Sequence, residues 1–344
     1  MAISHISAKR FGVFTSLDLD FVPGINVLLG ANATGKSQLL KLLYALHTEV
    51  ENNSLGGLEG KLLRVFRPDS LGRLVHRTNG RSKASVAMKM AGGSEISFTL
   101  STLGRFTPEG TPGKFEPTAR CIFIPSREVL SLFPGFVALY DGRELEFDET
   151  YYDTRKLLSL PALRGPRAAN ASKLMRHVGD ALGGGVTEAD GRFYVSRSEG
   201  GVWVDLEASL LSEGLRKVAT LVRLIANGSL SDKSVLFWDE PEANMNPRLL
   251  RDMVRFLQGV AEQGVQVFVA THDTLLSQRL SLPGELGLRN AVPTRFFSFF
   301  RTEKDIVDVE QAATLREIEH NPILEEFKRF RDEQYDLSGG DSAA

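Results

Sequence analysis

Apolar segments alternate with amphipathic segments along most of the chain. Nearly continuous apolar runs of the kind found in strands buried on both faces occur at 25–30 (INVLLG), 234–240 (SVLFWDE) and 265–273 (VQVFVATHD). Apolar residues at helical spacing occur at 38–50, 215–225 and 249–264. Buried strands that alternate with helices predict an α/β fold with a mainly parallel central sheet.

The chain between these segments follows other patterns. Short segments broken by Gly, Asn and Ser predict an antiparallel meander with strands at 62–66, 73–77, 84–90 and 95–101. A Gly/Pro/Thr-rich loop at 104–118 then leads to a buried strand, CIFIP, at 121–125. A mostly helical region follows, and GRFYVSRSEGGVWVDL predicts a hairpin with Gly200 and Gly201 in its turn. TRFFSFF and DIVDVEQ predict a C-terminal hairpin, followed by a charged helix.

The composition is that of an ordinary globular protein, with 42% hydrophobic and 24% charged residues. Cys121 is the single cysteine, which excludes an intramolecular disulfide and a multi-cysteine zinc site. The N-terminus lacks the layout of a signal peptide, and no apolar run approaches the ~18 residues that a membrane span needs. We therefore expect a cytoplasmic protein that does not enter the membrane.

The net charge is only −2, but the charge is unevenly distributed. Eight basic residues and one acid lie between Lys61 and Lys89, and six basic residues and no acid lie between Arg155 and Gly179. From Glu303 to the end there are twelve acids and five bases. Such segregation is typical of solvated surfaces, and it is also the pattern of faces that bind polyanions or protein partners.

The strongest motif is GANATGKS, which fits G-x-x-x-x-G-K-[ST] and lies between a buried strand and a helix. Such a loop presents backbone N–H groups and a helix N-terminus to phosphates, with Lys36 at the β- and γ-phosphates and Ser37 as a ligand of Mg²⁺. The nucleotide-binding residues predicted here are Gly30, Ala31, Asn32, Ala33, Thr34, Gly35, Lys36, Ser37 and Gln38.

Polar residues end the other two buried strands. Asp239 can hold Mg²⁺, while Glu240 can orient and deprotonate the attacking water. His272, at the end of the next strand, can donate a hydrogen bond to the γ-phosphate. Each residue alone is weak evidence, since polar residues often end strands, but together with the phosphate loop they indicate a catalytic site formed by Lys36, Glu240 and His272.

A fourth segment, LLSEGLRK, places Ser212, Glu213 and Gly214 at the start of a helix. Taken alone, a serine in this position is most often an N-cap. The same hydroxyl, the backbone N–H groups and the helix dipole can also bind the γ-phosphate of a nucleotide held by another copy of the chain.

In this order the four segments resemble the ABC-type ATPases: GANATGKS as Walker A, LLSEGLRK as signature, VLFWDEPEANMNP as Walker B with D-loop, and ATHD as His switch. SEGLRK, DEPEANMNP and IPSREV are similar to the branch labelled AAA-type ATP-binding proteins, which is related to the ATPase domains of OLD (overcoming lysogenization defect) nucleases, to RecF and to SMC heads. Transporter ATPases typically have Gly-Gly-Gln after the signature serine and Thr after the Walker B proline. The residues here are Glu213, Gly214, Leu215 and Glu242, which argues against a transporter.

The resemblance implies a head-to-tail homodimer that encloses ATP and Mg²⁺ at its interface, with the number of subunits above two left open. Ser212 and Gly214 would then act on the ATP of the opposite subunit, and Asn244 and Asn246 would lie at the dimer seam. The family's Q-loop glutamine, expected after CIFIP, is absent. Ser126, Arg127 and Glu128 occupy that part of the sequence. Phe11 and Phe14 are weak candidates for the contact with adenine. For each of them we favour a role in core packing.

On this basis we expect one ABC-type ATPase domain over 1–344. Its parts are a nucleotide-binding lobe with Walker A and the meander (1–125), a mostly helical insertion (126–205), the signature, Walker B and His-switch region (206–300), and a C-terminal hairpin strand, charged helix and frayed tail (301–344).

The insertion is too short, and too rich in Gly and Pro, for the coiled-coil arms of SMC proteins. Only 72 residues follow His272, without an obvious acidic metal triad, so we expect no nuclease activity of the chain's own. By family analogy we predict a regulatory ATPase that controls a separately encoded effector, a nuclease or toxin, in bacterial anti-phage defence. The alternative is a RecF-like ATPase in DNA repair or replication that binds nucleic acid through its basic stretches.

Overall fold

The computed structural model describes residues 2–52, 54–111, 120–132, 135–142, 145–165, 171, 173–175 and 182–339. Parts of the predicted Gly/Pro/Thr-rich loop (112–119), of the predicted helical insertion (166–170, 172, 176–181) and of the predicted frayed tail (340–344) lie outside these residues. Within the described ranges no helix is both long enough and apolar enough to cross a bilayer.

A six-stranded sheet in the order β14-β13-β3-β12-β11-β7 forms the centre of the molecule. Its strands are β3 (Ile25–Gly30), β7 (Cys121–Ile124), β11 (Val235–Asp239), β12 (Gln266–Thr271), β13 (Thr294–Arg301) and β14 (Val307–Ala312). All neighbours in this sheet are parallel except β13 and β14, which form an antiparallel pair. The predicted α/β fold with a mainly parallel central sheet is confirmed.

Two further sheets are antiparallel. The larger has the order β2-β1-β4-β5-β6 and consists of β1 (Ile3–Phe11), β2 (Phe14–Asp20), β4 (Lys83–Met90), β5 (Glu95–Ser101) and β6 (Phe106–Thr111). The smaller consists of β8 (Val186–Ala189), β9 (Arg192–Glu199) and β10 (Val202–Glu207). The predicted hairpin turn at Gly200 and Gly201 joins β9 to β10, and both glycines have positive φ.

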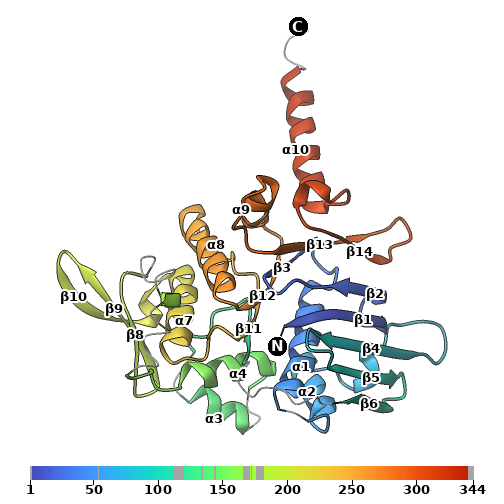
Figure 1. The fold of residues 1–344 in the computed structure, drawn as a ribbon, viewed down its shortest axis with the longest axis horizontal. Coiled ribbons are helices and arrows are strands. Elements are labelled where there is room, and N and C mark those ends of the chain that lie inside the picture. The colour runs from blue at the N-terminus through green and yellow to red at the C-terminus, as the bar shows by residue number, and fades with distance from the viewer. Residues whose placement is uncertain are drawn as a thin grey trace.

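The helices cover the two faces of the central sheet (Figure 1). The helices with bounds in the described residues are α1 (Lys36–Glu51), α2 (Leu58–Phe66), α3 (Phe136–Asp141), α4 (Glu149–Leu158), α7 (Glu213–Ala226), α8 (Pro247–Glu262), α9 (Thr274–Glu285) and α10 (Pro322–Gly339). Alternate residues of the central strands point into two separate hydrophobic cores. On β12, Phe268 packs with α1 and the large antiparallel sheet, whereas Val267 and Val269 pack with α7, α8 and α9. The α10 helix projects away from the body (Figure 1).

Three local predictions were wrong. Residues 62–66 are helical, because Leu58, Leu62 and Val65 pack as one buried face of α2. The strand predicted at 73–77 is replaced by a short 3-10 helix, η1 (Leu71–Leu74), and a single bridge to Phe11. Part of the predicted loop, Phe106–Thr111, is instead strand β6. It lies at the edge of its sheet, where Pro108 is tolerated although proline has no N–H to donate.

Candidate functional site

The phosphate loop, Gly30–Ser37, has a backbone that requires its two glycines. Gly30 has φ +144°, and a Cβ there would lie 2.2 Å from the Phe299 carbonyl oxygen. Gly35 has φ +96° and precedes α1, and a Cβ there would lie 2.5 Å from the Phe14 ring. The loop is therefore fixed between β13 and the start of β2, with the N-terminal N–H groups of α1 directed into it.

Lys36 extends back across this loop. Its Nζ donates to the carbonyl oxygens of Gly30, at 2.7 Å, and Ala31, at 2.8 Å. Burial lowers the pKa of Lys36, whereas the carboxylates of Asp239, Glu240 and Glu242 oppose that effect. The lysine is thus close to the Walker B acids, and among the described residues no carboxylate forms an ion pair with it.

The Mg²⁺ ligands predicted from the sequence meet in the fold. Ser37, on the first turn of α1, donates its hydroxyl to Oδ1 of Asp239, at the end of β11, over 3.0 Å. Burial raises the pKa of Asp239, and this hydrogen bond partly offsets the effect. A hydroxyl and a carboxylate in contact are hard oxygen ligands that suit Mg²⁺, which takes its remaining ligands from phosphate and water. The residues present therefore fit the metal.

Glu240 and His272 lie side by side at the ends of neighbouring strands. His272 Nδ1 is 3.3 Å from Oε1 of Glu240, and both side chains are partly exposed. The Glu240 amide donates to the Ala270 carbonyl at 2.9 Å, and Glu240 has φ +50°, in the left-handed region. Because a residue with a Cβ adopts this region only at a cost of about 1–2 kcal/mol, the surrounding contacts must hold it there.

Glu242 anchors the His272 loop, a role that the sequence analysis missed. Its buried carboxylate accepts hydrogen bonds from the Thr271 hydroxyl at 2.7 Å and from the His272 amide at 3.2 Å. Burial raises the pKa of Glu242, and these hydrogen bonds partly offset the effect. Its position two residues after Glu240, where transporters have a small hydroxyl, was the available signal.

A cavity of about 460 Å³ adjoins the phosphate loop on the β1–β2 side, and its lining includes Gln38, Arg77 and Arg301. Gln38 accepts a hydrogen bond from the Val13 amide at 3.2 Å, which joins α1 to the β1–β2 turn. Arg301, which the sequence analysis did not single out, donates to the Ala33 carbonyl at 3.1 Å.

The two aromatic candidates for an adenine contact both belong to the core. Phe11 and Phe14 have relative exposures of 0%. Phe11 packs against the Phe66 and Phe98 rings, and Phe14 lies close to Phe299. Their preferred role in core packing therefore agrees with the structure.

The signature residues lie apart from this group. Ser212, Gly214, Asn244 and Asn246 help to line a separate cavity of about 390 Å³, and no residue of the phosphate loop is among those that line it. Ser212 occupies the N-cap position of α7, as expected, but its side chain makes no capping hydrogen bond. The hydroxyl at the N-terminus of α7 remains available to an outside group.

A pair of charged residues occupies the neighbourhood of the missing Q-loop glutamine. Oε1 of Glu128 is 2.9 Å from Nε of Arg216 on α7, and both side chains are largely buried. Glu128 also accepts a hydrogen bond from the Ser131 amide at 3.0 Å. The segment after β7 is therefore tied to the helix that begins with the signature.

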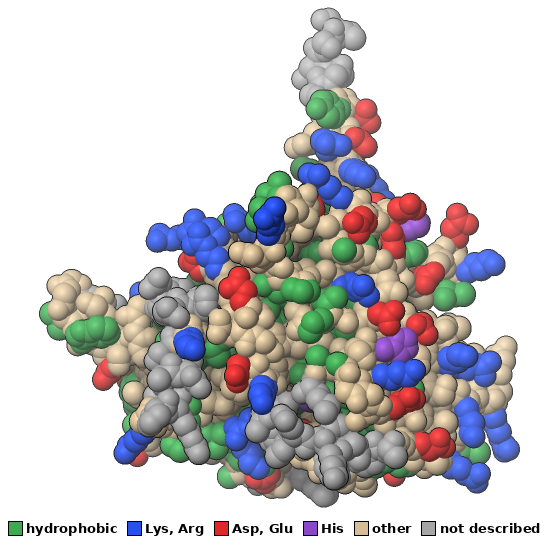
Figure 2. All heavy atoms as spheres, viewed as in Figure 1, with side chains coloured by type: hydrophobic (Ala, Val, Ile, Leu, Met, Phe, Trp, Pro, Cys, Tyr) green, Lys and Arg blue, Asp and Glu red, His purple; other side chains and the backbone are tan. Residues whose placement is uncertain are grey.

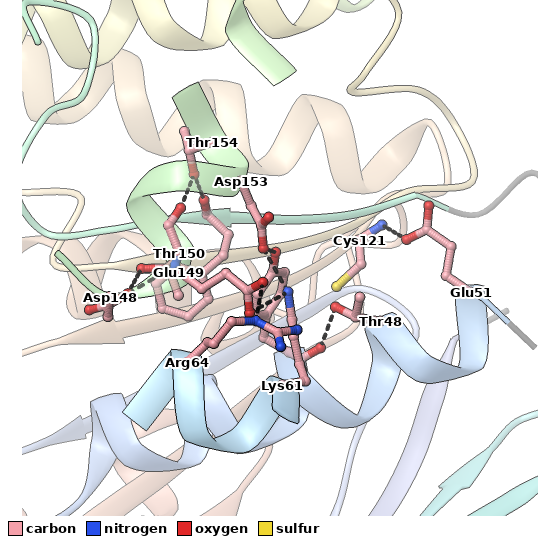
Figure 3. A network of polar contacts seen from close by, with 12 residues as sticks. Thr48, Glu51, Lys61, Arg64, Cys121, Asp148, Glu149, Thr150, Asp153 and Thr154 are labelled. Atoms are coloured by element: carbon pink, nitrogen blue, oxygen red, sulfur yellow. Dashed lines mark hydrogen bonds and ion pairs between the residues drawn. The ribbon is translucent and has the colours of Figure 1, made fainter. Parts of the chain in front are cut away.

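The α4 helix is tied to the phosphate-loop helix and to α2 by a polar network (Figure 3). Nζ of Lys61 on α2 lies 2.6 Å from Asp153 and 3.3 Å from Glu149, both on α4, and Arg64 on α2 lies 2.7 Å from Glu149. Lys41 on α1 pairs with Asp148, the N-cap of α4, at 2.9 Å. Two residues of the first basic stretch (Lys61 to Lys89), Lys61 and Arg64, therefore form ion pairs within the protein.

Comparison with known families gives a match over residues 125–277 to a model described as an AAA domain, putative AbiEii toxin, type IV toxin–antitoxin system. The matched segment runs from the end of β7 past His272. It therefore includes the signature, the Walker B acids and the His switch.

Curated relatives are similar to this chain over only part of their own length. The DNA replication and repair protein RecF of Limosilactobacillus fermentum is 32% identical over 97 residues, which cover 27% of this chain and 24% of that protein. The macrolide export ATP-binding/permease protein MacB of Syntrophobacter fumaroxidans is 30% identical over 167 residues, 47% of this chain and 21% of that protein. The chain thus spans about a quarter or less of the length of these relatives.

Solved structures share the fold at low identity. An SMC head bound to the C-terminal winged-helix domain of ScpA has a TM-score of 0.57 and 12% identity over 92% of this chain and 99% of that chain. The head from Pyrococcus furiosus, with an extended coiled coil, has a TM-score of 0.53 and 11% identity over 96% of this chain and 99% of that chain. The chain therefore shares its fold with these SMC heads.

Proposed function

We propose that the chain is an ABC-type ATPase that binds ATP with Mg²⁺ and hydrolyses it. The observation that carries the proposal is the convergence of Ser37, Asp239, Glu240 and His272 beside the phosphate loop. Three separate segments of the sequence supply an anion cradle, two oxygen ligands for a metal, a carboxylate and an imidazole within one site.

Each side chain has a distinct part in the reaction. The loop amides and Lys36 bind the β- and γ-phosphates, and Ser37 and Asp239 hold Mg²⁺, which would neutralise phosphate charge when bound. Glu240 orients the attacking water and accepts its proton. His272, held near Glu240, donates a hydrogen bond toward the γ-phosphate.

We propose further that the active form is a head-to-tail homodimer. The phosphate loop of one subunit would face the Ser212–Gly214 helix start of the other, so that each ATP is bound by both chains. The separation of the two groups within one chain, together with the uncapped Ser212 hydroxyl, supports this arrangement. The N-terminus of α7 would supply N–H groups and a favourable dipole to the γ-phosphate.

Mixing two inactive variants tests both the reaction and the dimer. We expect Lys36→Ala and Ser212→Ala to abolish most Mg²⁺-dependent ATP hydrolysis when each is assayed alone. A mixture of the two forms heterodimers with one intact site, and activity should return. Recovery is expected only if the loop and the signature act from different chains; an unchanged sum of the two residual rates would refute the dimeric site.

For the biological role, we propose control of a separately encoded effector, a nuclease or toxin, in bacterial anti-phage defence. The matched family description, a putative toxin of a toxin–antitoxin system, supports a role of this kind. Copurification from the native host, with and without ATP, tests it. The effector proposal fails if no product of a neighbouring gene accompanies the chain in either state.

A RecF-like role in DNA repair or replication is the second candidate, supported by the RecF relatives and by one surface. Exposed basic residues gather at one end of the large antiparallel sheet: Lys9, Arg10, Arg77, Arg81, Lys83 and Arg105. The register that pairs Lys9 with Ser85 and Lys83 with Ser101 brings them to the same end, where Figure 2 shows a group of Lys and Arg side chains. DNA binding that weakens steeply with salt, and is lost on charge reversal there, is the expected signature.

A further inference from the structure

Lys217 lies on α7 and is almost completely buried, with a relative exposure of 1%. Its Nζ donates a hydrogen bond to the main-chain carbonyl of Glu240 at 2.9 Å. Burial lowers the pKa of this lysine, and nearby carboxylates, chiefly those of Glu213 and Glu242, oppose the effect. A buried lysine is costly, so its presence at the back of the Walker B segment needs a reason.

The segment that Lys217 contacts is strained at both ends. Glu240 and Asn244 are non-glycine residues with φ of +50° and +63°. The α7 helix touches the carbonyls of both: Lys217 donates to Glu240, and Gly214 packs so closely that a Cβ there would lie 2.9 Å from the Asn244 oxygen. The Ala243 amide also donates to the Glu240 carbonyl, at 3.2 Å. One helix therefore supports the whole turn between the Walker B strand and the D-loop.

We propose that Lys217 is a positioning residue that holds Glu240 in its left-handed conformation and thereby aims the carboxylate that acts on water. It touches neither nucleotide nor metal. It acts through the Glu240 main chain, with its long side chain filling the space between α7 and the end of β11.

A second consequence rests on the proposed function. Ser212 and Lys217 belong to the same helix start and are separated by about 7.5 Å along the axis. Ser212 binds the nucleotide of the partner subunit, whereas Lys217 positions the base that serves the chain's own nucleotide. A shift of α7 when the partner's ATP arrives is therefore passed to Glu240, and hydrolysis at one site becomes faster when the other is occupied.

A purely structural role for Lys217 predicts a different pattern. Loss of any buried lysine lowers overall stability, but only loss of a positioning residue loosens 239–246 selectively and changes turnover without changing ATP binding. Lys61 offers a matched control, because it is also buried, at 4% exposure, and lies in the α2–α4 network rather than behind Glu240.

The experiment compares Lys217→Met with Lys61→Met in the full chain. Amide hydrogen exchange over 239–246, and at Ala243 above all, should accelerate in Lys217→Met and remain as in the parent in Lys61→Met. In the same samples, kcat for ATP should fall at least ~10-fold in Lys217→Met with the Kd for ATP within ~3-fold, and the Hill coefficient should approach 1. If Lys217→Met does not fold, Lys217→Arg, which keeps a donor on a differently shaped head, is measured in its place.

Each outcome decides the proposal. Unchanged exchange at 239–246 together with unchanged kcat overturns it, as does equal acceleration in both lysine variants. Accelerated exchange with a lowered kcat but an unchanged Hill coefficient supports the positioning role and refutes the link between sites. If the parent chain itself does not hydrolyse ATP, the proposed function fails, and the exchange comparison still decides whether Lys217 holds the Glu240 turn.

Discussion

The hydroxyl of Ser37 donates a hydrogen bond to Oδ1 of Asp239 over 3.0 Å, although 202 positions separate the two residues. Ser37 lies in the first turn of the helix after β3, and Asp239 ends β11, two strands away across β12. Parallel strands bring their carboxyl ends to one edge of a sheet, and in this chain that edge collects every acidic and basic group assigned to the hydrolytic reaction.

Replacing Glu240 with Gln should lower kcat for ATP by about 10²- to 10⁴-fold, because the amide cannot accept the proton of the attacking water. ATP binding should persist, and the proposed dimer should accumulate with nucleotide bound. Single-turnover hydrolysis and size-exclusion chromatography with ATP measure the two effects. Hydrolysis at the parent rate would remove Glu240 from the role of base.

Replacing Lys36 with Ala should weaken ATP binding by about 10- to 100-fold, since a hydrogen bond between charged groups contributes roughly 1.5–3 kcal/mol. Titration with a fluorescent ATP analogue gives the affinity. Lys41→Ala on the same helix is the matched control, because Lys41 pairs with Asp148. Equal losses in both variants would mean that the effect arises from α1 as a whole.

Replacing Glu242 with Gln should raise the free energy of unfolding near neutral pH. Burial raises the pKa of Glu242 above its ordinary 4.5, so the folded chain holds this proton more tightly than the unfolded chain does. Stability is therefore lost as the pH rises through the interval between the ordinary and the raised pKa. Urea unfolding from pH 4 to 8 should show the difference between variant and parent growing over that interval. A difference that shrinks would contradict the assigned cause.

Removing either partner of the Glu128–Arg216 pair should cost about 2 kcal/mol, because the pair is largely buried and the remaining charge loses its partner. The Glu326–Arg329 pair on α10 has the same 2.9 Å separation but is mostly exposed, so its loss should have little effect. Double-mutant cycles from denaturant unfolding measure both pairs. Similar coupling energies in the two pairs would show that burial is not the deciding factor.

Much of the fold follows from local patterns, and the errors have identifiable causes. The buried strands and α8 follow from apolar runs and helical spacing. Residues 62–66 were misassigned because a five-residue apolar segment fits a strand as well as a helix. The Lys61 side chain, paired with Asp153 on α4, adds a contact that no local pattern contains. Pro108 and Gly110 concealed strand β6, since both residues disfavour strands except at an edge.

The residues of the candidate site could be predicted from the sequence more readily than the residues that hold its backbone in place. Spacing and strand ends led to the prediction that Lys36 and Asp239 lie in one site, because phosphate and metal chemistry restrict residue types strongly, and the two residues are close in the structure. Lys217 and Glu242 act on backbone groups of distant segments, and such contacts depend on the packing of α7 and β12. A lysine after a helix start carries no sequence signal for that role, and Glu242 gave only the signal of a residue that departs from the transporter pattern.

The network at α4 has a mechanical consequence. The Lys41–Asp148 pair fastens one end of α4 to the helix that follows the phosphate loop, while at the other end Arg223 and Asn227 donate to the carbonyls of Leu158 and Leu157. The α4 helix is thus a strut between α1 and the far end of α7. These contacts oppose independent rotation of α1 and α7. A tilt of one helix must therefore move the other helix as well, or break these bonds.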